Sequence, residues 1–436
     1  MWQKRRKFFI LILDQQKLYL MKSQKTHLYL IFLECLLLAA AGWHCAGLRP
    51  RPYVKGKIPI IRVLIAANDS NLVISSKGAF RFLSEGKVLF QEPKGIRVSI
   101  QCDENGNFAI VSAGGKISFV TRQLTVQSAN PRQWLCLNDV PYRGRFEIKL
   151  TNRHSLLVIN TIDLESYLKG VVPAEIGVQD HIELEAMKAQ AVAARTYALE
   201  KLEHSSPDSD YNLKASVADQ VYKGVAGEST MGNRAVESTI GEVMTYKGNL
   251  IRAYYHSTCG GRTEFGENVW EIHEPYLEGI ADNFGDGDFC SISPHYRWIE
   301  IWDVDKLALE LCSYLEDNHS PSRAVHLQSL TVEERFPSGR VKKLKIILND
   351  REYCLQGNRI RWALRRPDKT PLRSTLFKVR TFSKDGQIEA VMLIGAGNGH
   401  GVGMCQWGAI GMAQQGFSYK QILKHYYRGV KIERYY

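Results

Sequence analysis

Short hydrophobic runs alternate with polar turn sequences between residues 58 and 150. The runs are rich in β-branched and aromatic residues, and Gly, Asn, Asp and Ser separate them. Runs of this length, bounded in this way, are typical of β-strands. The pattern predicts strands at residues 60–66, 71–76, 80–84, 87–91, 96–101, 108–113, 116–121 and 145–150. Their regular spacing predicts a small β-rich domain. Because no catalytic set of side chains falls within it, we expect a binding or scaffolding role.

After residue 150, helical and extended segments follow each other. Residues 155–162 have the character of a strand and residues 163–172 that of a short helix. Asp180 followed by Glu183 resembles a capping box, and the helix that it would begin continues to about residue 203. Apolar side chains recur on one face of that helix at helical spacing: Leu184, Met187, Ala191, Ala194, Ala198 and Leu202.

The remainder of the chain continues this mixture. The pattern predicts strands at residues 242–248 and 250–258, and helices at residues 230–241 and 303–317, from about residue 406 and from residue 419. The predicted fold class is α+β. A β-rich accessory domain over residues 58–150 precedes a mixed α+β catalytic domain over residues 151–436.

The N-terminal region has the organisation of an export signal. An apolar run at residues 28–42 is too short to span a bilayer comfortably, follows basic residues and leads into small ones. We expect residues 1–45 to comprise an upstream extension and a signal peptide, with Met21 as the true start, and residues 46–57 to form a linker. An uncleaved membrane anchor is the alternative, and lipidation at Cys45 is a weaker one because the residues before it fit that signal poorly. The expected location is therefore periplasmic or facing the cell wall.

Composition and charge narrow the functional class only slightly. The 436 residues are 44% hydrophobic and 23% charged, as in globular proteins of two or three domains, and the formal net charge is +12. Such an excess could serve nucleic acid, an anionic membrane surface or an acidic polysaccharide. The densest basic clusters, residues 4–7 and 359–366, carry no nucleic-acid motif. No nucleic-acid partner is expected, and a solvated basic surface is favoured over a binding face.

Glu175 is the principal candidate for acid–base chemistry. It follows Pro173 in an apolar setting, just before the predicted long helix. A desolvated carboxyl group has a raised pKa and can protonate a leaving oxygen near neutral pH. Glycosidases ordinarily pair two carboxylates, but no compelling partner lies nearby in the sequence. Lys188 and Arg195 are seven residues apart on the helix, and either forms a solvated cationic stripe or places one side chain near Glu175.

A glycine-rich segment at residues 395–403 forms the second candidate feature. It contains a GxGxxG pattern, but no βαβ frame surrounds it, so we do not expect a nucleotide site. A backbone-exposed loop would let His400, Gln406 and Trp407 face a sugar ring. A tight structural turn is the alternative.

The cysteines allow either a disulfide or a metal. Seven of the nine lie beyond the signal region, and no C-x-x-C motif is present. In an exported protein we favour a disulfide between Cys259 and Cys290. His256 and Cys259 are also weak zinc candidates, and the two further ligands that zinc needs would be His400 and Cys405 only if the fold brings them close. We expect no cofactor, with zinc as the alternative.

Several of these stretches together resemble the stage II sporulation protein D family, whose SpoIID/LytB domain also occurs in amidase enhancers. The resemblance covers roughly residues 150–436 and is weakest between about 300 and 390. It is carried by GVVPAEIGVQDHIELEAMKAQAVAARTYAL, ADQVYKGV, AYYHSTCGGRT, ENVW, PYLEGIAD, GHGVGMCQWGAIGMAQQG and ILKHYYRG.

The resemblance implies a lytic transglycosylase acting on peptidoglycan glycan strands, with Glu175 as its acid and base. It would cleave between N-acetylmuramic acid and N-acetylglucosamine, and the muramic 6-hydroxyl would capture the sugar to give a 1,6-anhydro end. The residues that the resemblance assigns to the substrate groove are Lys188, Arg195, Asp219, Gln220, Tyr222, His256 and Ser257. Cys405 stands where a serine is usual. Some family members bind zinc through a Cys/His cluster whose spacing is not found here.

Two other functions compete with the enzyme. The first is a non-catalytic amidase enhancer, and the second is a module that only binds glycan. Glu175 in its motif favours the enzyme. The expected partners are glycan strands and, for the enhancer, a cell-wall amidase or the division machinery; membrane attachment would come only from an uncleaved signal. Sporulation and septal remodelling are equally compatible with the sequence.

Overall fold

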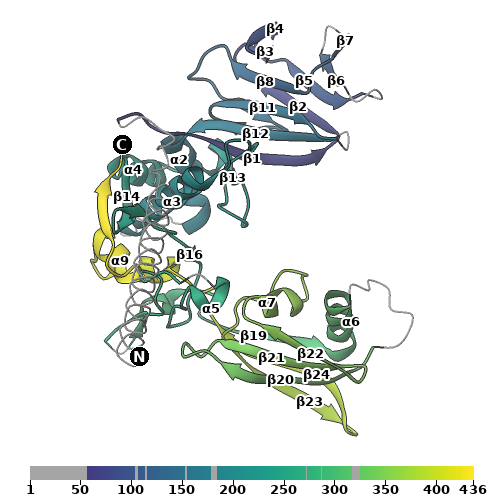
Figure 1. Ribbon diagram of the computed structural model, residues 1–436, viewed down its shortest axis with the longest axis vertical. Coiled ribbons are helices and arrows are strands. Elements are labelled where there is room, and N and C mark those ends of the chain that lie inside the picture. The colour runs from purple at the N-terminus through teal and green to yellow at the C-terminus, as the bar shows by residue number, and fades with distance from the viewer. Residues whose placement is uncertain are drawn as a thin grey trace, which may run out of the picture. The chain divides into compact units, whose positions relative to one another are not determined.

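The computed structural model describes residues 56–103, 107–112, 115–152, 155–177, 184–271, 273–285, 287–316 and 325–436. The expected signal peptide, the start at Met21, most of the linker and the capping-box pair Asp180 and Glu183 lie outside these residues. Within the described part, no helix has the length and apolar character needed to cross a membrane. The chain combines sheets and helices, with a β-rich N-terminal region followed by a mixed region, which confirms the expected α+β class (Figure 1).

Two β-sheets make up the N-terminal region. The first has seven strands in the order β13 (Leu213–Lys214), β1 (Ile60–Asp69), β12 (Leu156–Asp163), β11 (Arg145–Leu150), β8 (Gln123–Ser128), β3 (Phe80–Ser84) and β4 (Lys87–Glu92). The second has six strands in the order β10 (Val140–Tyr142), β9 (Leu135–Leu137), β2 (Asn71–Ser76), β5 (Arg97–Cys102), β6 (Phe108–Ser112) and β7 (Gly115–Phe119). All eight expected strands are present, while β8, β9 and β10 were not expected.

Alternation along these strands accounts for their packing. In β2, β5, β8 and β11, every second residue is buried, as the pleat requires when one face of a sheet covers a core. The boundary expected at residue 150 lies within the first sheet, because β12 pairs with both β11 and β1. The buried side chains of both sheets also belong to the same hydrophobic core as the helices that follow. This continuity ties the start of the next helix, α2, to the sheets.

Helix α2 (Leu164–Ile176) carries Glu175 in its last turn. Asp163 caps its N-terminus by accepting a hydrogen bond from the Ser166 backbone N–H at 2.9 Å. Gly177 ends it in the left-handed conformation, with φ of 68°, which suits glycine. The sequence pattern placed the helix end near residue 172, just before Pro173. In the structure the helix continues through Pro173, so Glu175 lies in the last turn of α2 and, as expected, precedes the long helix α3.

Helix α3 (Leu184–His204) follows and is buried on every side through most of its length. This differs from the one-sided pattern expected from the sequence. It packs against α2, α4 (Thr230–Ser238), β14 (Glu242–Tyr246), β15 (Asn249–Leu250), α8 (Gln406–Gln414) and α9 (Tyr419–Tyr426). Its many alanines let these elements approach closely. The surrounding elements include η2 (Gly224–Gly227) and β26 (Lys431–Arg434), which pairs with β14.

Short elements connect this helical layer to the glycine-rich segment. The strand expected at residues 250–258 is reduced to β15 and β16 (Tyr255–His256), and β16 pairs with β25 (Met404–Cys405). Between them along the chain lie α5 (Glu267–Trp270), β17 (Asn283–Phe284), β18 (Gly287–Asp288) and η3 (Phe289–Ile292). The β16–β25 pair brings the His256 turn beside the start of α8, although more than 140 residues separate them in the chain.

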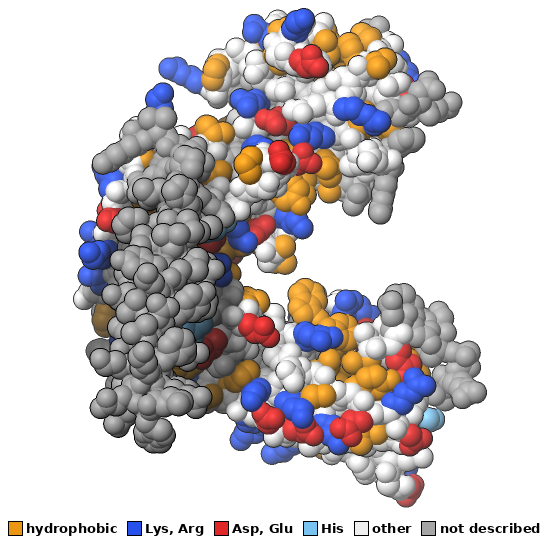
Figure 2. All heavy atoms as spheres, viewed as in Figure 1, with side chains coloured by type: hydrophobic (Ala, Val, Ile, Leu, Met, Phe, Trp, Pro, Cys, Tyr) orange, Lys and Arg blue, Asp and Glu red, His pale blue; other side chains and the backbone are white. Residues whose placement is uncertain are grey.

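Residues between η3 and β25 build a second hydrophobic core. One three-stranded sheet has the order β19 (Arg297–Asp303), β24 (Gln387–Ala396) and β23 (Phe377–Lys384); another has β20 (Leu327–Arg335), β21 (Val341–Leu348) and β22 (Arg351–Gln356). Helices α6 (Val304–Leu315) and α7 (Arg359–Ala363) complete it. On the face seen in Figure 2, Lys and Arg side chains are interspersed with Asp and Glu rather than gathered into a single patch.

Candidate active site

A cavity of about 720 Å³ contains Glu175 and draws its walls from both cores. One wall comes from α2, α3, the segment at residues 217–221, the turn at residues 254–257 and Trp270. The other comes from residues 361–373, with His295 and the glycine-rich segment beside it. A cavity of this volume is in the usual range for a small-molecule or oligosaccharide subsite. Of the groove residues expected from sequence, six line it: Glu175, Asp219, His256, Ser257, His400 and Gln406.

Glu175 has the environment of a general acid. Burial raises the pKa of its carboxyl group to about 7. Hydrogen bonds oppose this rise because they favour the ionised form: the Val221 backbone N–H donates to Glu175 Oε1 at 2.5 Å, and the side chains of Gln406 and Tyr255 also contribute. The carboxyl group therefore changes its protonation state near neutral pH, as acid–base catalysis requires.

Asp219 is the other carboxylate in the cavity wall, and its two oxygens are already engaged. Oδ1 accepts a hydrogen bond from the Tyr197 hydroxyl at 3.0 Å, and Oδ2 accepts one from the Lys214 backbone N–H at 2.9 Å. Lys201 Nζ lies 3.8 Å from Oδ1. These contacts fix the segment that follows β13, which leads to the Val221 N–H that binds Glu175. Asp219 thus supports the site without sharing the environment of Glu175.

His256 and His400 are neutral at physiological pH. Burial, together with the proximity of His400, holds the pKa of His256 well below its usual range. Burial, with a contribution from Arg361, lowers the pKa of His400 to about 3. Their rings lie 5.5 Å apart, and His400 packs 4.7 Å from Trp270, which contacts Tyr254 at 4.5 Å. The result is an aromatic wall of the kind that packs against sugar rings.

Residues 361–373 supply the cationic part of the cavity, which the sequence did not identify as a site. Arg361, Arg366 and Arg373 line it together with the half-exposed Trp362. Arg366 and Arg373 both pair with Glu300, at 2.8 and 3.2 Å. The only sequence signal was the basic run at residues 359–366, which was assigned to a solvated surface. Tyr255, which contacts Glu175, carried no signal beyond its place in the AYYHSTCGGRT motif.

The other expected groove residues lie outside the cavity wall. Lys188 pairs with Glu185 at 2.6 Å. Tyr222 donates a hydrogen bond to Asn160 at 3.0 Å and is buried. Gln220 is fully buried but acts on the site indirectly, because its side-chain N–H donates to the Tyr255 hydroxyl at 3.0 Å. Two further expected residues, Arg195 and Trp407, do not line the cavity either.

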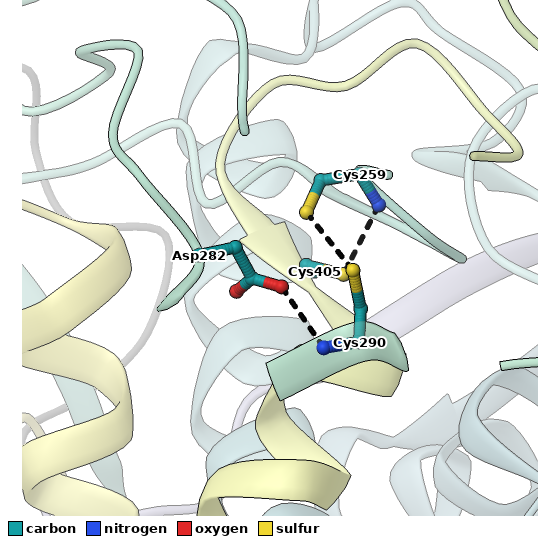
Figure 3. Close-up of side chains that lie close together, drawn as sticks. All are labelled: Cys259, Asp282, Cys290 and Cys405. Atoms are coloured by element: carbon teal, nitrogen blue, oxygen red, sulfur yellow. Dashed lines mark hydrogen bonds between the residues drawn. The ribbon is translucent and has the colours of Figure 1, made fainter. Parts of the chain in front are cut away.

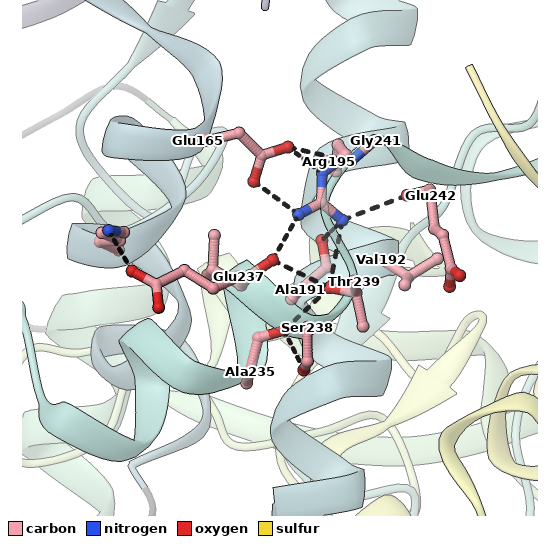
Figure 4. A network of polar contacts seen from close by, with 12 residues as sticks. Glu165, Ala191, Val192, Arg195, Ala235, Glu237, Ser238, Thr239, Gly241 and Glu242 are labelled. Atoms are coloured by element: carbon pink, nitrogen blue, oxygen red, sulfur yellow. Dashed lines mark hydrogen bonds and ion pairs between the residues drawn. The ribbon is translucent and has the colours of Figure 1, made fainter. Parts of the chain in front are cut away.

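Arg195 is a structural residue rather than a substrate ligand. Its guanidinium is completely buried and forms a bidentate pair with Glu165, at 2.8 and 2.7 Å. It also donates to the backbone carbonyls of Glu242 and Val236, at 3.1 and 3.3 Å. Figure 4 shows this network joining α2, α3 and the segment after α4. The expectation that Lys188 or Arg195 would reach toward Glu175 is not met, since both side chains have other partners.

The cysteine pair favoured as a disulfide is close but unlinked. The sulfur atoms of Cys259 and Cys290 lie 3.5 Å apart as free thiols, beyond the S–S bond length of about 2.05 Å. Cys405 and Asp282 complete a buried group with them. His256 is not part of this group, and its Nδ1 donates a hydrogen bond to the Val402 carbonyl at 3.1 Å. Of the four metal candidates expected from sequence, the group contains Cys259 and Cys405, while Cys290 and Asp282 take the places of His256 and His400.

Comparison with known proteins places the chain in a family. Residues 152–246 match the model described as Stage II sporulation protein. Stage II sporulation protein D of Bacillus amyloliquefaciens is 31% identical over 298 residues, which cover 65% of this chain and 76% of that protein. The chain belongs to the stage II sporulation protein D family. This membership confirms the resemblance found in the sequence.

Two further relatives extend the comparison. An uncharacterised protein of Brachyspira hyodysenteriae is 33% identical over 299 residues, covering 69% of this chain and 74% of that protein. The amidase enhancer of Bacillus subtilis is 30% identical over 294 residues, covering 62% of this chain and 40% of that protein. Residues 290–403 also match a domain of unknown function, DUF8618. Both matched regions supply walls of the Glu175 cavity.

Proposed function

We propose that this protein is a lytic transglycosylase that cleaves peptidoglycan glycan strands between N-acetylmuramic acid and N-acetylglucosamine. The observation that carries the proposal is Glu175, a buried carboxyl group with a pKa of about 7 in the wall of a large cavity. A carboxyl group with this pKa is still substantially protonated at neutral pH. It can therefore deliver a proton to a glycosidic oxygen, which a carboxyl group of ordinary pKa cannot do effectively.

In the proposed reaction, the Glu175 carboxyl group protonates the bridging oxygen as the bond from that oxygen to the muramic C1 breaks. The muramic 6-hydroxyl attacks C1 and closes the 1,6-anhydro ring, and its proton passes to the Glu175 carboxylate. The enzyme returns to its starting state and no water is consumed. One carboxyl group is sufficient for this sequence, consistent with an Asp219 whose oxygens are engaged by Tyr197 and Lys214.

The remainder of the cavity suits a glycan carrying acidic groups. The wall made by Tyr254, Trp270 and His400 offers aromatic faces to a sugar. Arg361 and Trp362 on the opposite wall offer a cation and a partly exposed indole. The N-acetylmuramic acid lactyl group, or the stem peptide attached to it, presents a carboxylate or amides that a guanidinium recognises. Because peptidoglycan lies outside the cytoplasmic membrane, the proposal includes export, with a periplasmic or wall-facing location.

The test is mass spectrometry of purified peptidoglycan after incubation with wild-type protein, Glu175→Gln and Glu278→Gln. Glu278 is an exposed carboxylate of the same region and provides the matched control. We expect 1,6-anhydro ends from the wild type and Glu278→Gln, and none from Glu175→Gln, because the amide keeps the shape but cannot donate the proton. Equal turnover by Glu175→Gln would remove Glu175 from the mechanism, and reducing ends would indicate hydrolysis by water.

The second candidate function is amidase enhancement, favoured by the relative of that name. In that case neither the wild type nor the variants would cleave glycan, although they would still bind it. A partner amidase would release stem peptides faster when this protein is present. Glu175→Gln would then leave enhancement unchanged. The same digests distinguish the two functions, since glycan-strand cleavage and stem-peptide release yield different products.

A further inference from the structure

We propose that Cys259, Asp282, Cys290 and Cys405 form a structural zinc site. Their four ligand atoms all lie within 4.8 Å of one another, and Figure 3 shows the side chains converging from separate segments. In a tetrahedral zinc site, bond lengths of about 2.3 Å to sulfur and about 2.1 Å to oxygen place the ligands roughly 3.6–3.8 Å apart. The separation of 3.5 Å between the Cys259 and Cys290 sulfurs is close to that value.

Backbone N–H groups point at two of the three sulfur atoms. Cys405 Sγ accepts hydrogen bonds from the backbone N–H groups of Cys259 and Gly408, at 3.2 and 3.3 Å. Cys259 Sγ accepts one from the Gly261 N–H at 3.4 Å. Cys405 also caps the N-terminus of α8, where the helix dipole stabilises negative charge. Hydrogen bonds of this kind to the ligands form the outer shell of metal sites.

A buried cation offsets part of the charge that the group would carry. Three thiolates and one carboxylate around Zn²⁺ leave an excess of negative charge. Arg340 is fully buried, and its guanidinium donates to the Cys259 carbonyl at 2.8 Å. Two of its nitrogens, Nε and Nη1, have no hydrogen-bond partner among the described residues. Asp282 is held in place by the Tyr426 hydroxyl and by the Cys290 N–H at 3.1 Å.

A metal explains this group better than a disulfide. Joining Cys259 to Cys290 would use only two of the four converging groups and would leave the convergence of Cys405 and Asp282 on the same point without a purpose. Thiolate-rich tetrahedral sets select zinc among abundant divalent ions. All four residues are fully buried, so no coordination position opens to substrate. The site is therefore structural and supplies no chemistry to the reaction.

The position of the site gives it a role in shaping the cavity. Cys259 follows the cavity residues His256 and Ser257, and Cys405 immediately precedes Gln406. Gln406 is one of the side chains that hydrogen-bond Glu175. A metal joining the His256 turn, η3 and the start of α8 would fix the positions of these cavity residues relative to one another, although their segments are far apart in the chain. This inference does not depend on which reaction the cavity performs.

The test is metal analysis of the full chain by inductively coupled plasma mass spectrometry. We expect about one zinc per wild-type chain, as for a closed four-ligand site, and loss of most of it in Cys405→Ser. The matched control is Cys312→Ser, a buried cysteine of the other core, which should retain the zinc. Wild-type protein produced with cobalt should show the charge-transfer absorption of a tetrahedral cobalt–thiolate site, and this measurement does not depend on a variant folding.

Three results would overturn the proposal. The first is wild-type protein that carries no stoichiometric zinc and no cobalt–thiolate band. The second is a Cys259–Cys290 disulfide found by peptide mapping of unreduced, alkylated protein. The third is a folded Cys405→Ser chain that retains as much zinc as Cys312→Ser.

Discussion

The raised pKa of Glu175 makes the stability of the protein depend on pH in a way that one substitution should remove. Its carboxyl group has a pKa of about 7 in the folded chain, against 4.5 when unperturbed. As pH rises, the unfolded chain therefore ionises first and the folded chain resists ionisation. Wild-type stability should fall between these two pKa values, because the unfolded state binds fewer protons there.

The size of this effect follows from the shift. A difference of about 2.5 pKa units corresponds to roughly 3 kcal/mol once both states have reached their limits. Most of it, about 2.5 kcal/mol, is lost between about pH 5 and pH 8. Glu175→Gln has no proton to lose at this position. Between about pH 5 and pH 8, the unfolding free energy of Glu175→Gln relative to that of the wild type should therefore rise by about 2.5 kcal/mol.

The assay is urea denaturation at several pH values across this interval, following the same spectroscopic signal for both chains. Comparing differences between chains cancels the titration of all other groups. Glu278→Gln is the control, and its difference from the wild type should stay almost constant with pH because the residue is exposed. In the same interval, glycan cleavage by the wild type should decline as pH rises above about 7, since the acid form is lost.

Two results would refute this reasoning. If the stability difference between Glu175→Gln and the wild type does not change with pH, Glu175 is not desolvated as the cavity geometry implies. If stability shows the expected change but cleavage persists undiminished well above pH 7, Glu175 is buried and titrates, but it is not the acid of the reaction.

Two further predictions concern residues on either side of the site. Arg195→Met should lower the free energy of unfolding by about 3–5 kcal/mol, because it leaves the buried Glu165 without its partner; urea denaturation measures this, and Arg97→Met, which breaks an exposed pair, should change it far less. A loss no larger than that of Arg97→Met would contradict the structural role. Trp362→Ala should raise the Kd for glycan oligomers about tenfold with little effect on stability, as expected for removal of an aromatic binding face. Calorimetric titration tests this against Phe382→Ala, a similarly exposed aromatic residue outside the cavity; equal affinity of the two variants would exclude Trp362 from the binding surface.

Local pattern was sufficient to predict most of the elements. Short runs rich in β-branched and aromatic residues, separated by turn residues, indicated eight strands in the N-terminal region. The long alanine-rich helix was predicted from apolar residues at helical spacing, although the structure buries it on every side. The three strands β8, β9 and β10 were missed; two of them are only three residues long, too short to establish a period.

The end of α2 shows where local rules failed. The predicted helix ended near residue 172, but α2 continues through Pro173, a residue type that is disfavoured inside helices. Tertiary packing holds the helix through Pro173, with the proline ring close to Gly232 of α4. The sequence nevertheless identified Glu175 as a candidate acid, since a lone carboxyl group among apolar neighbours is a local feature.

Only the tertiary structure decided what surrounds that carboxyl group. The partners of Glu175 come from Val221, Tyr255 and Gln406, and Arg361 enters the same cavity from a second core. The cysteine cluster likewise joins positions as distant as residues 259 and 405. Hydrophobic periodicity records only whether a side chain faces the core, and not which distant side chains it contacts there. Desolvation and ion pairing depend on those contacts, so the pKa of Glu175 and the burial of Arg195 could not be read from the sequence.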